Sequence, residues 1–453
     1  MTTPAAGPSA RSARALALGI LLRVERDGAH AAPLLDARCV ELPPRDRDLL
    51  RALVKRTLRG AIRLDHVLAR HLDRPADRLD PAVRSALRLG AAQLLLMDRI
   101  PKHAAVAGTV EAVKGTSPKA AGLVNAVLRR VAAEEERPGQ VVLPDGTPLC
   151  LRLALEFSHP EWLVRRWLLD LGEEGARAAL AADQADAPVD LLADPRLGPT
   201  MAIRARLAAD GVETEPSPWA PLALTVVSGE VARHPLVRSG ALAVVDAAAQ
   251  AMVEALPRAE ILVDLTAAPG GKCRTCLARG IARRVVALEK AAFRAARLSA
   301  NLDASGRRGE VLVVRADAGR PPLPQGRFES VLLDAPCSGT GTLRKSPEIR
   351  LRLREADLVA SAAVQRRLLA AGLRLLAPGG TLAYMTCSLE PEENERVVES
   401  VLAEGAGFES VPPDPARLPA PLAACLRPSG LLRVPPGATN DGFSLLLVRR
   451  APA

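Results

Sequence analysis

The chain has 453 residues, which is enough for two or three domains that each bury a core. Hydrophobic residues make up 48% of it and aromatic residues 2%, so the cores must be aliphatic and rows of aromatic side chains for stacking many bases are excluded. The net charge is +10, and residues 1–150 carry 24 Lys and Arg against 16 Asp and Glu, which indicates a polyanionic partner for this first third. The alternative is a general compositional bias toward arginine.

The seven cysteines are irregularly spaced, which is typical of a reducing compartment. Cys273 and Cys276 form a C-x-x-C pair, but no second pair accompanies them, so we interpret them as packing residues and expect no metal. The apolar run at residues 15–22 is short and is followed at once by Arg23, and no run reaches transmembrane length. We therefore expect a cytoplasmic protein that contacts no membrane, and a monomer.

The first part of the chain has a helical pattern. Residues 1–11 are small and polar and are predicted to be a flexible tail. From residue 12 onward apolar residues recur at helical spacing, with prolines between the runs. The predicted helices are at residues 15–24, 48–58, 64–72, 81–97, 105–113 and 120–131. An all-helical bundle over residues 12–137 follows from this pattern.

A basic stripe lies within this predicted bundle. Arg51, Lys55, Arg59 and Arg63 are four residues apart, so they are expected along one face of a helix. A solvated helix face is the simpler interpretation. Together with the local excess of positive charge, the spacing favours contact with phosphates, and we predict these four residues to bind RNA.

Residues 138–235 are predicted to hold a linker and a small α+β subdomain. Charged, proline and glycine residues up to Pro148 indicate the linker, and a helix is expected from about Ser158 to Leu171. Two predicted strands at residues 189–193 and 222–227 flank a predicted helix at residues 199–210.

From residue 236 to residue 453 predicted strands alternate with predicted helices, which implies a parallel, doubly wound α/β sheet. The strands are expected at residues 261–265, 284–288, 311–314, 328–333, 381–385 and 444–448. The helices are expected near residues 272–279, 290–303, 356–376 and 391–404, and the proline-rich residues 411–421 are expected to form a surface loop.

Three of these strands end in residues suited to a nucleoside. The first runs into the glycine turn of residues 264–272, where backbone N–H groups can approach a ligand closely. Glu289 ends the second strand, where a carboxylate can accept hydrogen bonds from two ribose hydroxyls. Asp317 follows the third and can accept from an adenine amino group. The combination predicts a nucleoside cofactor without phosphates, S-adenosylmethionine, whereas three unrelated surface acids are the alternative.

Two further strand ends carry thiols. Asp334 and Cys337 follow the strand at residues 328–333, and Cys387 follows the strand at residues 381–385. Carbon C5 of cytosine is too weak a nucleophile to accept a methyl group unaided, and a thiolate added to C6 activates it. That chemistry needs a nucleophilic thiol, an acid that contacts the base, and a group that assists release. Each cysteine taken alone would more often be a packing residue.

Several motifs resemble known families. "LRLGAAQLLLMDRIPKHAAVAGTVEAVK" and "GLVNAVLRRV" resemble the NusB-like RNA-binding module, and "DLTAAPGGK", "LLDAPCSGTGTLRKSPEIR", "YMTCSLEPEENERVV" and "NDGFSLLLVRR" resemble four motifs of RNA cytosine-5 methyltransferases. In this order they resemble the RsmB family, also called Sun or Fmu, which methylates a cytosine of 16S ribosomal RNA. The resemblance implies an all-α NusB-like bundle, a small α+β subdomain and a Rossmann-like class I methyltransferase domain.

The resemblance also implies roles for individual residues. Cys387 would be the nucleophile, Cys337 the group that assists release, and Asp334 would lie between cofactor and cytosine. Glu289 and Asp317 would bind the nucleoside of S-adenosylmethionine. The implied cofactor loop is Thr266, Ala267, Ala268, Pro269, Gly270, Gly271 and Lys272.

The chain departs from the family pattern at several places. Thr266 replaces the usual Cys, Glu289 replaces the usual Asp, and Ser444 replaces an aromatic residue. The strand at residues 189–193 lacks the Arg and Asn that the family usually carries there, which puts an RNA role for it in doubt. Three alternatives stay open: the same chemistry on transfer RNA or 23S RNA, a non-catalytic RNA-binding protein, and an amino-nitrogen methyltransferase, which would need no thiol.

Overall fold

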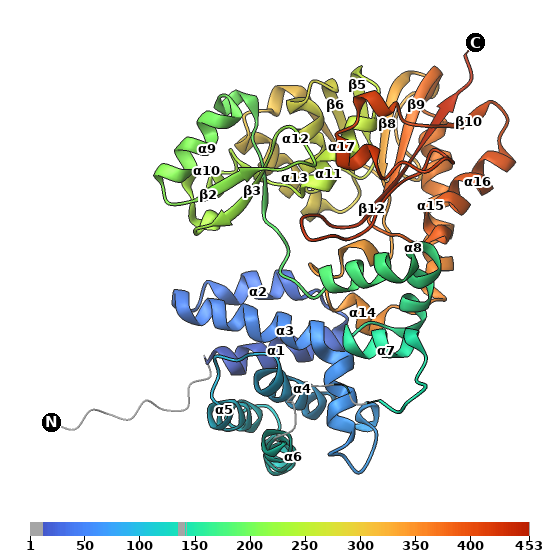
Figure 1. Cartoon of the computed structure of the whole chain (residues 1–453). Coiled ribbons are helices and arrows are strands. Elements are labelled where there is room, and N and C mark those ends of the chain that lie inside the picture. Colours follow the sequence, from blue (N-terminus) through green and yellow to red (C-terminus); the bar gives the residue numbers. More distant parts are fainter. Residues whose placement is uncertain (1–11, 135–140, 142, 453) are drawn as a thin grey trace. The chain divides into compact units, whose positions relative to one another are not determined.

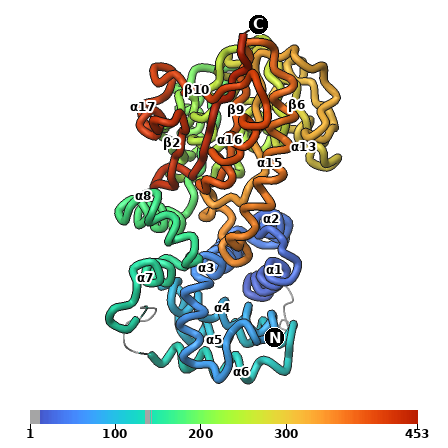
Figure 2. The backbone as a smooth tube through the Cα atoms, turned by 90° about the vertical axis from the view of Figure 1, so that its right-hand side faces the viewer, coloured from blue at the N-terminus to red at the C-terminus, as the bar shows by residue number. Residues whose placement is uncertain are grey.

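The computed structural model describes residues 12–134, 141 and 143–452, so the predicted flexible tail at residues 1–11 and part of the predicted linker lie outside the described residues. The chain forms two compact units (Figures 1 and 2). One, the helical unit, comprises residues 1–185 and 343–353. The other, the sheet unit, comprises residues 186–342 and 354–453.

The helical unit contains helices and no strand among its described residues. Its helices are α1 (Ala13–Asp27), α2 (Ala31–Cys39), α3 (Pro44–Ala69), α4 (Pro81–Leu95), α5 (Lys102–Lys114), α6 (Ala121–Ala133), α7 (Leu149–Glu156), α8 (Glu161–Ala182) and α14 (Ile349–Arg352). Their ends follow local rules. Ser12 caps α1 by accepting from Ala15 N, Gly28 ends it at φ 63°, and Asp80 caps α4 ahead of Pro81.

Two helix predictions need correction. The helices expected at residues 48–58 and 64–72 are one continuous helix, α3, because no residue between them breaks it. Gly60, in the middle, lets Leu96 pack against the helix backbone, since a Cβ there would lie 2.5 Å from Leu96 Cδ1.

Helix α2 was not predicted. Helix α8 is interrupted at Gly172 (φ 70°), one residue after the predicted helix end at Leu171.

The core of the helical unit is aliphatic, as the composition requires. Leu18, Leu50, Leu53, Leu89 and Leu128 are fully buried in one cluster contributed by α1, α3, α4 and α6. Burying one such side chain contributes roughly 1.5–3 kcal/mol.

The segment of residues 343–353 is built into this helical unit, although it directly follows Thr342 of the sheet unit in the chain. Arg350 is 2% exposed and donates to the carbonyl oxygens of Arg59 and Ser158 (3.3 Å each) and Asp183 (3.4 Å). Burial lowers the pKa of Arg350 to about 10. Glu348 accepts from Ala31 N at 3.2 Å. The guanidinium thus connects the middle of α3, the loop before α8 and the end of α8, which are far apart in sequence.

We predict that Arg350→Ala lowers the free energy of unfolding of the helical unit by about 3 kcal/mol, because it leaves buried carbonyls without donors. Chemical denaturation followed by far-UV circular dichroism measures the loss. Arg354→Ala, at an exposed position just beyond the segment, is the control and should change little. Equal stability of the two variants would contradict the role given to Arg350.

The sheet unit begins with a small antiparallel sheet of four strands, in the order β2-β3-β1-β4. Its strands are β1 (Asp190–Leu192), β2 (Glu213–Pro216), β3 (Ala223–Ser228) and β4 (Ala243–Val244), with helices α9 (Thr200–Ala209) and α10 (Pro235–Arg238). The short strands β2 and β4 were not predicted. Buried Asp190 accepts from Thr225 Oγ1 at 2.6 Å and from Ala247 N at 2.9 Å, which connects this sheet to the start of helix α11 (Ala247–Met252).

The second sheet of the unit has eight strands, in the order β10-β12-β9-β8-β5-β6-β7, with β11 beside β12. They are β5 (Ala259–Asp264), β6 (Ala282–Glu289), β7 (Val311–Arg315), β8 (Phe328–Asp334), β9 (Leu376–Thr386), β10 (Phe408–Val411), β11 (Leu432–Val434) and β12 (Phe443–Arg450). The helices are α11 (Ala247–Met252), α12 (Gly271–Ala278), α13 (Ala292–Ala304), α15 (Asp357–Leu373), α16 (Glu395–Glu404) and α17 (Ala420–Ala423).

Strands β5 to β9 are parallel, as predicted, but β12 runs antiparallel to β9. The expectation of a wholly parallel sheet was therefore wrong at this edge, where β10 and β11 also pair antiparallel and were not predicted. Helices cover both faces. Leu332 packs in one cluster with Cys276 of α12, whereas Leu333 packs in another with Leu369 of α15.

The strand order places a switch point beside β5. From β5 the chain proceeds to β6 and β7 on one side, and later to β8 and β9 on the other. The loops after β5 and β8 therefore diverge and leave a crevice at the carboxyl ends of the strands, where open α/β sheets bind ligands.

Candidate active site

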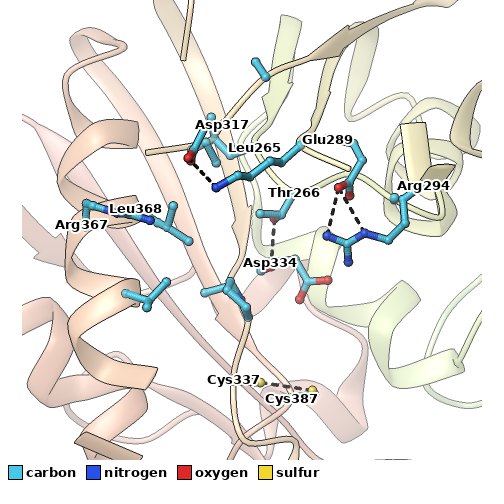
Figure 3. A pocket seen from close by; sticks show the side chains of 17 residues that line it. Leu265, Thr266, Glu289, Arg294, Asp317, Asp334, Cys337, Arg367, Leu368 and Cys387 are labelled. Carbon is cyan, nitrogen blue, oxygen red and sulfur yellow. Dashed lines mark hydrogen bonds and ion pairs between the residues drawn. The ribbon is translucent and has the colours of Figure 1, made fainter. Parts of the chain in front are cut away.

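A cavity of about 390 Å³ lies at this crevice (Figure 3). Residues that follow β5, β6, β7, β8 and β9 contribute to its wall, together with side chains from α15. The lining residues are Leu265, Thr266, Ala268, Glu289, Lys290, Arg294, Ala316, Asp317, Ala318, Asp334, Ala335, Pro336, Cys337, Val364, Arg367, Leu368 and Cys387.

The structure brings the two predicted thiols together. Sγ of Cys337 lies 3.3 Å from Sγ of Cys387, although the residues are fifty positions apart (Figure 3). The loops that carry them are joined by Gly341 N, which donates to Cys387 O at 2.9 Å. Gly341 is required here because a Cβ would lie 2.4 Å from the carbonyl oxygen of Gly442.

The two sulfurs differ in proton affinity. A hydrogen bond from Cys337 lowers the pKa of Cys387, although burial and the charge of Asp334 oppose this. The same hydrogen bond, burial and the charge of Glu393 raise the pKa of Cys337 well above its ordinary value. The pair therefore favours a thiolate on Cys387 and a proton on Cys337, and the thiolate is the nucleophilic form.

Asp334 lies beside this pair. Lys272 Nζ is 2.6 Å from Asp334 Oδ2, and Thr266 Oγ1 donates to Asp334 O at 2.9 Å. Burial lowers the pKa of Lys272, but the charge and hydrogen bond of Asp334, together with the charge of Asp264, outweigh burial, and the net shift is upward. The lysine therefore stays charged and holds the Asp334 carboxylate.

The predicted cofactor loop turns from β5 into α12. Gly270 adopts φ 105°, a left-handed conformation, and a Cβ there would lie 2.8 Å from Leu298. The Ala268–Pro269 peptide bond is cis, and Asn301 Nδ2 donates to Pro269 O at 2.9 Å. Of the loop residues only Thr266 and Ala268 line the cavity. Ala267, Pro269, Gly270, Gly271 and Lys272 shape the turn behind it.

Glu289 and Asp317, the two acids predicted to bind the nucleoside, both line the cavity, and each has a basic neighbour. Glu289 Oε1 accepts from Ala291 N at 2.7 Å and from Arg294 Nε at 3.1 Å. Asp317 Oδ2 accepts from Lys290 Nζ at 2.9 Å, and this hydrogen bond lowers the pKa of Asp317.

Sequence reasoning did not find the basic neighbours or the part of α15 in the wall. Lys290 could have been found, since it directly follows Glu289. Val364, Arg367 and Leu368 are spaced as one face of a helix, but nothing in that pattern distinguishes a cavity wall from an ordinary helix face.

The prediction that the basic stripe of α3 forms a phosphate-binding face needs correction at one position. Arg59 is 2% exposed and its Nη2 donates to Arg344 O at 3.2 Å, so the prediction that it lies on a phosphate-binding face is wrong. The physical reason is that the segment of residues 343–353 packs over this turn of the helix. Arg51 is exposed, and Lys55 and Arg63 are partly exposed. Contact of these three with RNA stays a prediction.

Cys273 and Cys276 are fully buried in the core, which confirms their interpretation as packing residues. Within the described ranges, no group of three His, Cys, Asp or Glu side chains is arranged to hold a metal ion. Across those same residues, no helix has the length and apolar character to cross a membrane.

A doubly wound α/β sheet with a glycine turn after its first strand, acids at the next strand ends and a ligand-sized cavity at the switch point is the architecture of a methyltransferase. The wall of the same cavity also carries the thiol pair of Cys337 and Cys387.

Comparison with known proteins agrees with this class. Residues 251–444 match the family model described as 16S rRNA methyltransferase RsmB/F, residues 11–133 match the NusB family, and residues 159–231 match the ferredoxin-like domain of RsmF/B-like methyltransferases. A relative named ribosomal RNA small subunit methyltransferase B from Xanthomonas campestris is 34% identical and covers 90% of this chain and 91% of its own length. A relative of the same name from Xylella fastidiosa is 35% identical, covering 96% of each chain.

A solved structure titled "Crystal Structure of PH0851" superposes with a TM-score of 0.78 at 23% identity and covers 99% of this chain and 100% of its own. The chain belongs to the RsmB/F methyltransferase family, with a NusB-like helical region, a ferredoxin-like α+β domain and a mixed α/β methyltransferase domain.

The buried acid behind the glycine turn gives a pH-dependent prediction. Burial raises the pKa of Asp264 from 3.8 to about 6. The unfolded chain therefore releases this proton at lower pH than the folded chain, so folding stability falls as pH rises between about 4 and 6. Ionisation of Asp264 therefore lowers the free energy of unfolding by about 3 kcal/mol between about pH 4 and pH 6.

Asp264→Asn removes the carboxyl group that titrates. The difference in unfolding free energy between wild type and variant should therefore change by about 3 kcal/mol between pH 4 and pH 6.5. Urea denaturation at a series of pH values measures it. A difference that is constant with pH would show that Asp264 does not titrate in this range.

Proposed function

We propose that this protein transfers a methyl group from S-adenosylmethionine to C5 of a cytosine in 16S ribosomal RNA, through a transient bond between Cys387 and C6 of that cytosine. The observation that carries the proposal is the contact of two thiols, 3.3 Å apart, in the wall of a cavity that is also lined by Asp334, Glu289 and Asp317. An amino-nitrogen methyltransferase needs no such pair.

The thiol pair accounts for both halves of the reaction. Attack of the Cys387 thiolate on C6 moves the ring electrons to C5, which then forms a bond to the methyl carbon. S-adenosylmethionine would supply that methyl group from its positively charged sulfur, which would keep the electron pair of the broken methyl–sulfur bond. Loss of the C5 proton to a base then restores the double bond and expels the Cys387 sulfur. The Cys337 thiol, held at 3.3 Å, assists this step by donating a hydrogen bond to the leaving thiolate.

The cavity fits the proposed cofactor in size and in chemistry. Its volume lies within the range of small-molecule sites. Glu289 uses only Oε1 for the hydrogen bonds found among the described residues, so Oε2 can accept from a ribose hydroxyl. Thr266 and Glu289, which differ from the family pattern, keep a hydroxyl and a carboxylate at the cavity wall.

Ribosomal RNA as the substrate is supported by the relatives' names and by the charge of the first third of the chain, 24 Lys and Arg against 16 Asp and Glu. Transfer RNA and 23S RNA are the competing substrates. Bisulfite sequencing of RNA from cells with and without the gene discriminates among them, and loss of one 5-methylcytosine from 16S RNA is the expected result. Loss confined to transfer RNA or 23S RNA would contradict the assignment.

The cofactor role of Glu289 is tested by Glu289→Gln. The amide keeps the size of the side chain but loses the charge that receives ribose hydroxyls, so we expect the Kd for S-adenosylmethionine to rise about tenfold or more. Isothermal titration calorimetry measures it. Glu310→Gln, which alters an acid elsewhere on the sheet unit, is the control. An unchanged Kd for Glu289→Gln would remove Glu289 from the site.

The covalent step is tested by exchanging each thiol. Incubated with substrate RNA and cofactor, Cys337→Ala should accumulate a protein–RNA adduct that survives denaturing electrophoresis, because release is impaired. Cys387→Ala should form no adduct and should lose methylation. Full activity of Cys387→Ala, together with no adduct from Cys337→Ala, would contradict the mechanism.

A further inference from the structure

A buried carboxylate lies behind the thiol pair. Glu393 is in the 3-10 turn Pro391–Glu393 and is 0% exposed. Its Oε1 accepts from Ser338 N at 2.8 Å and from Gln365 Nε2 at 3.2 Å, and its Oε2 accepts from Ser338 Oγ. All three partners are donors, as an ionised carboxylate requires. No cation is among these three partners, each of which is a neutral donor.

Gln365, on helix α15, extends the same arrangement to the other side of the cysteine. Its Nε2 donates to Pro336 O at 2.9 Å as well as to Glu393 Oε1. Both neighbours are acceptors, which fixes the orientation of the amide. Gln365 is fully buried, and its Oε1 has no hydrogen-bond partner within the described part of the chain.

Together the two side chains hold both residues that flank Cys337. Pro336 precedes it and is held through its carbonyl, while Ser338 follows it and is held through its N–H and its hydroxyl. The loop that carries Cys387 joins the same network, because Ser388 Oγ lies 3.2 Å from Ser338 Oγ. Tyr384, on strand β9, holds the backbone of this turn by donating to the carbonyl oxygen of Glu393 at 2.5 Å.

The placement of the charge has a chemical consequence. The negative charge of Glu393 disfavours a second negative charge on Cys337, and it is one of the causes that raise the pKa of Cys337. A protonated Cys337 can donate to Cys387 across the 3.3 Å contact and so stabilise a thiolate there. The carboxylate therefore adds to the causes that keep the proton on Cys337 rather than on Cys387.

We propose that Glu393 and Gln365 are positioning residues, which hold Cys337 beside Cys387 with its proton in place and thereby make Cys387 the nucleophile. This inference rests on the proposed function for its catalytic meaning. The distribution of the proton between the two thiols is, however, a property of the protein alone and can be measured without RNA or cofactor.

The test measures the rate at which iodoacetamide alkylates Cys387 as a function of pH, with the modified peptide quantified by mass spectrometry. Only the thiolate reacts, so the midpoint of the curve reports the pKa of Cys387. Glu393→Gln keeps the shape of the side chain but removes the charge and introduces an amide N–H against Ser338. We expect the midpoint to rise by about one pH unit and alkylation at pH 7 to fall about tenfold.

The matched control is Glu392→Gln, the same chemical change at the preceding residue, whose carboxylate pairs with Arg396 at 2.7 Å. It should leave the midpoint where it is in wild type. Gln365→Ala, which releases Pro336 but leaves the carboxylate, should shift the midpoint in the same direction as Glu393→Gln and by less. If Glu393→Gln does not fold, the midpoint measured for Gln365→Ala tests the inference instead.

The activity of Glu393→Gln provides a second readout. We expect kcat to fall with little change in the KM for S-adenosylmethionine, and the loss to shrink as pH rises, because the thiolate is recovered at high pH. A folded Glu393→Gln with an unchanged alkylation midpoint overturns the inference, whatever its activity. A shifted midpoint together with no RNA adduct from Cys337→Ala would contradict the proposed function and leave the positioning role standing.

Discussion

The contact between the sulfurs of Cys337 and Cys387 is the constraint on which the rest of the sheet unit depends. Two thiols fifty residues apart lie 3.3 Å from each other because strands β8 and β9 are parallel neighbours whose carboxyl ends coincide. The two loops then pass close together and are joined by a backbone hydrogen bond from Gly341 N to Cys387 O, while Gly341 also packs against Gly442, just before β12. A shift of either strand by one residue would turn one sulfur away from the other.

The same geometry allows one cavity to hold the two substrates of the proposed reaction. The strand order leaves the crevice beside β5, and the carboxylates and the glycine turn lie on one side of it while the thiols lie on the other. Asp334 stands between them, fixed by Lys272 and by the hydroxyl of Thr266. This arrangement supports the proposal that a methyl donor and a pyrimidine meet at Asp334.

Much of the fold could be predicted from the sequence. The features that could not be predicted were missed for physical reasons. The parallel strands were found because strands buried on both faces are rich in consecutive apolar residues, as at residues 331–333. The antiparallel edge strands β10 and β11 are short, and β12 gives no signal of its direction. Arg59 looked like a surface residue because helical spacing does not show what covers a helix face. The segment that covers it lies nearly three hundred residues later in the chain.

The residues of the candidate site also divide into those that the sequence predicts and those that it does not. Acids, glycines and thiols at strand ends could be named because each carries its own chemical signal. Glu393 and Gln365 could not, because their importance lies in hydrogen bonds to Pro336 and Ser338 that only the folded chain creates. A glutamate among several in one stretch, and a glutamine in a helix, carry no distinguishing pattern.

The central claim is that the sulfur of Cys387 bonds to C6 of a cytosine during methyl transfer. Substrate RNA with fluorine in place of hydrogen at C5 tests it most directly, since the adduct can form and accept the methyl group but has no C5 proton to lose. After nuclease and protease digestion, mass spectrometry should find a methylated fluorocytidine nucleotide attached to the peptide that contains Cys387. Attachment at Cys337 instead, or methyl transfer with no covalent product, would contradict the account.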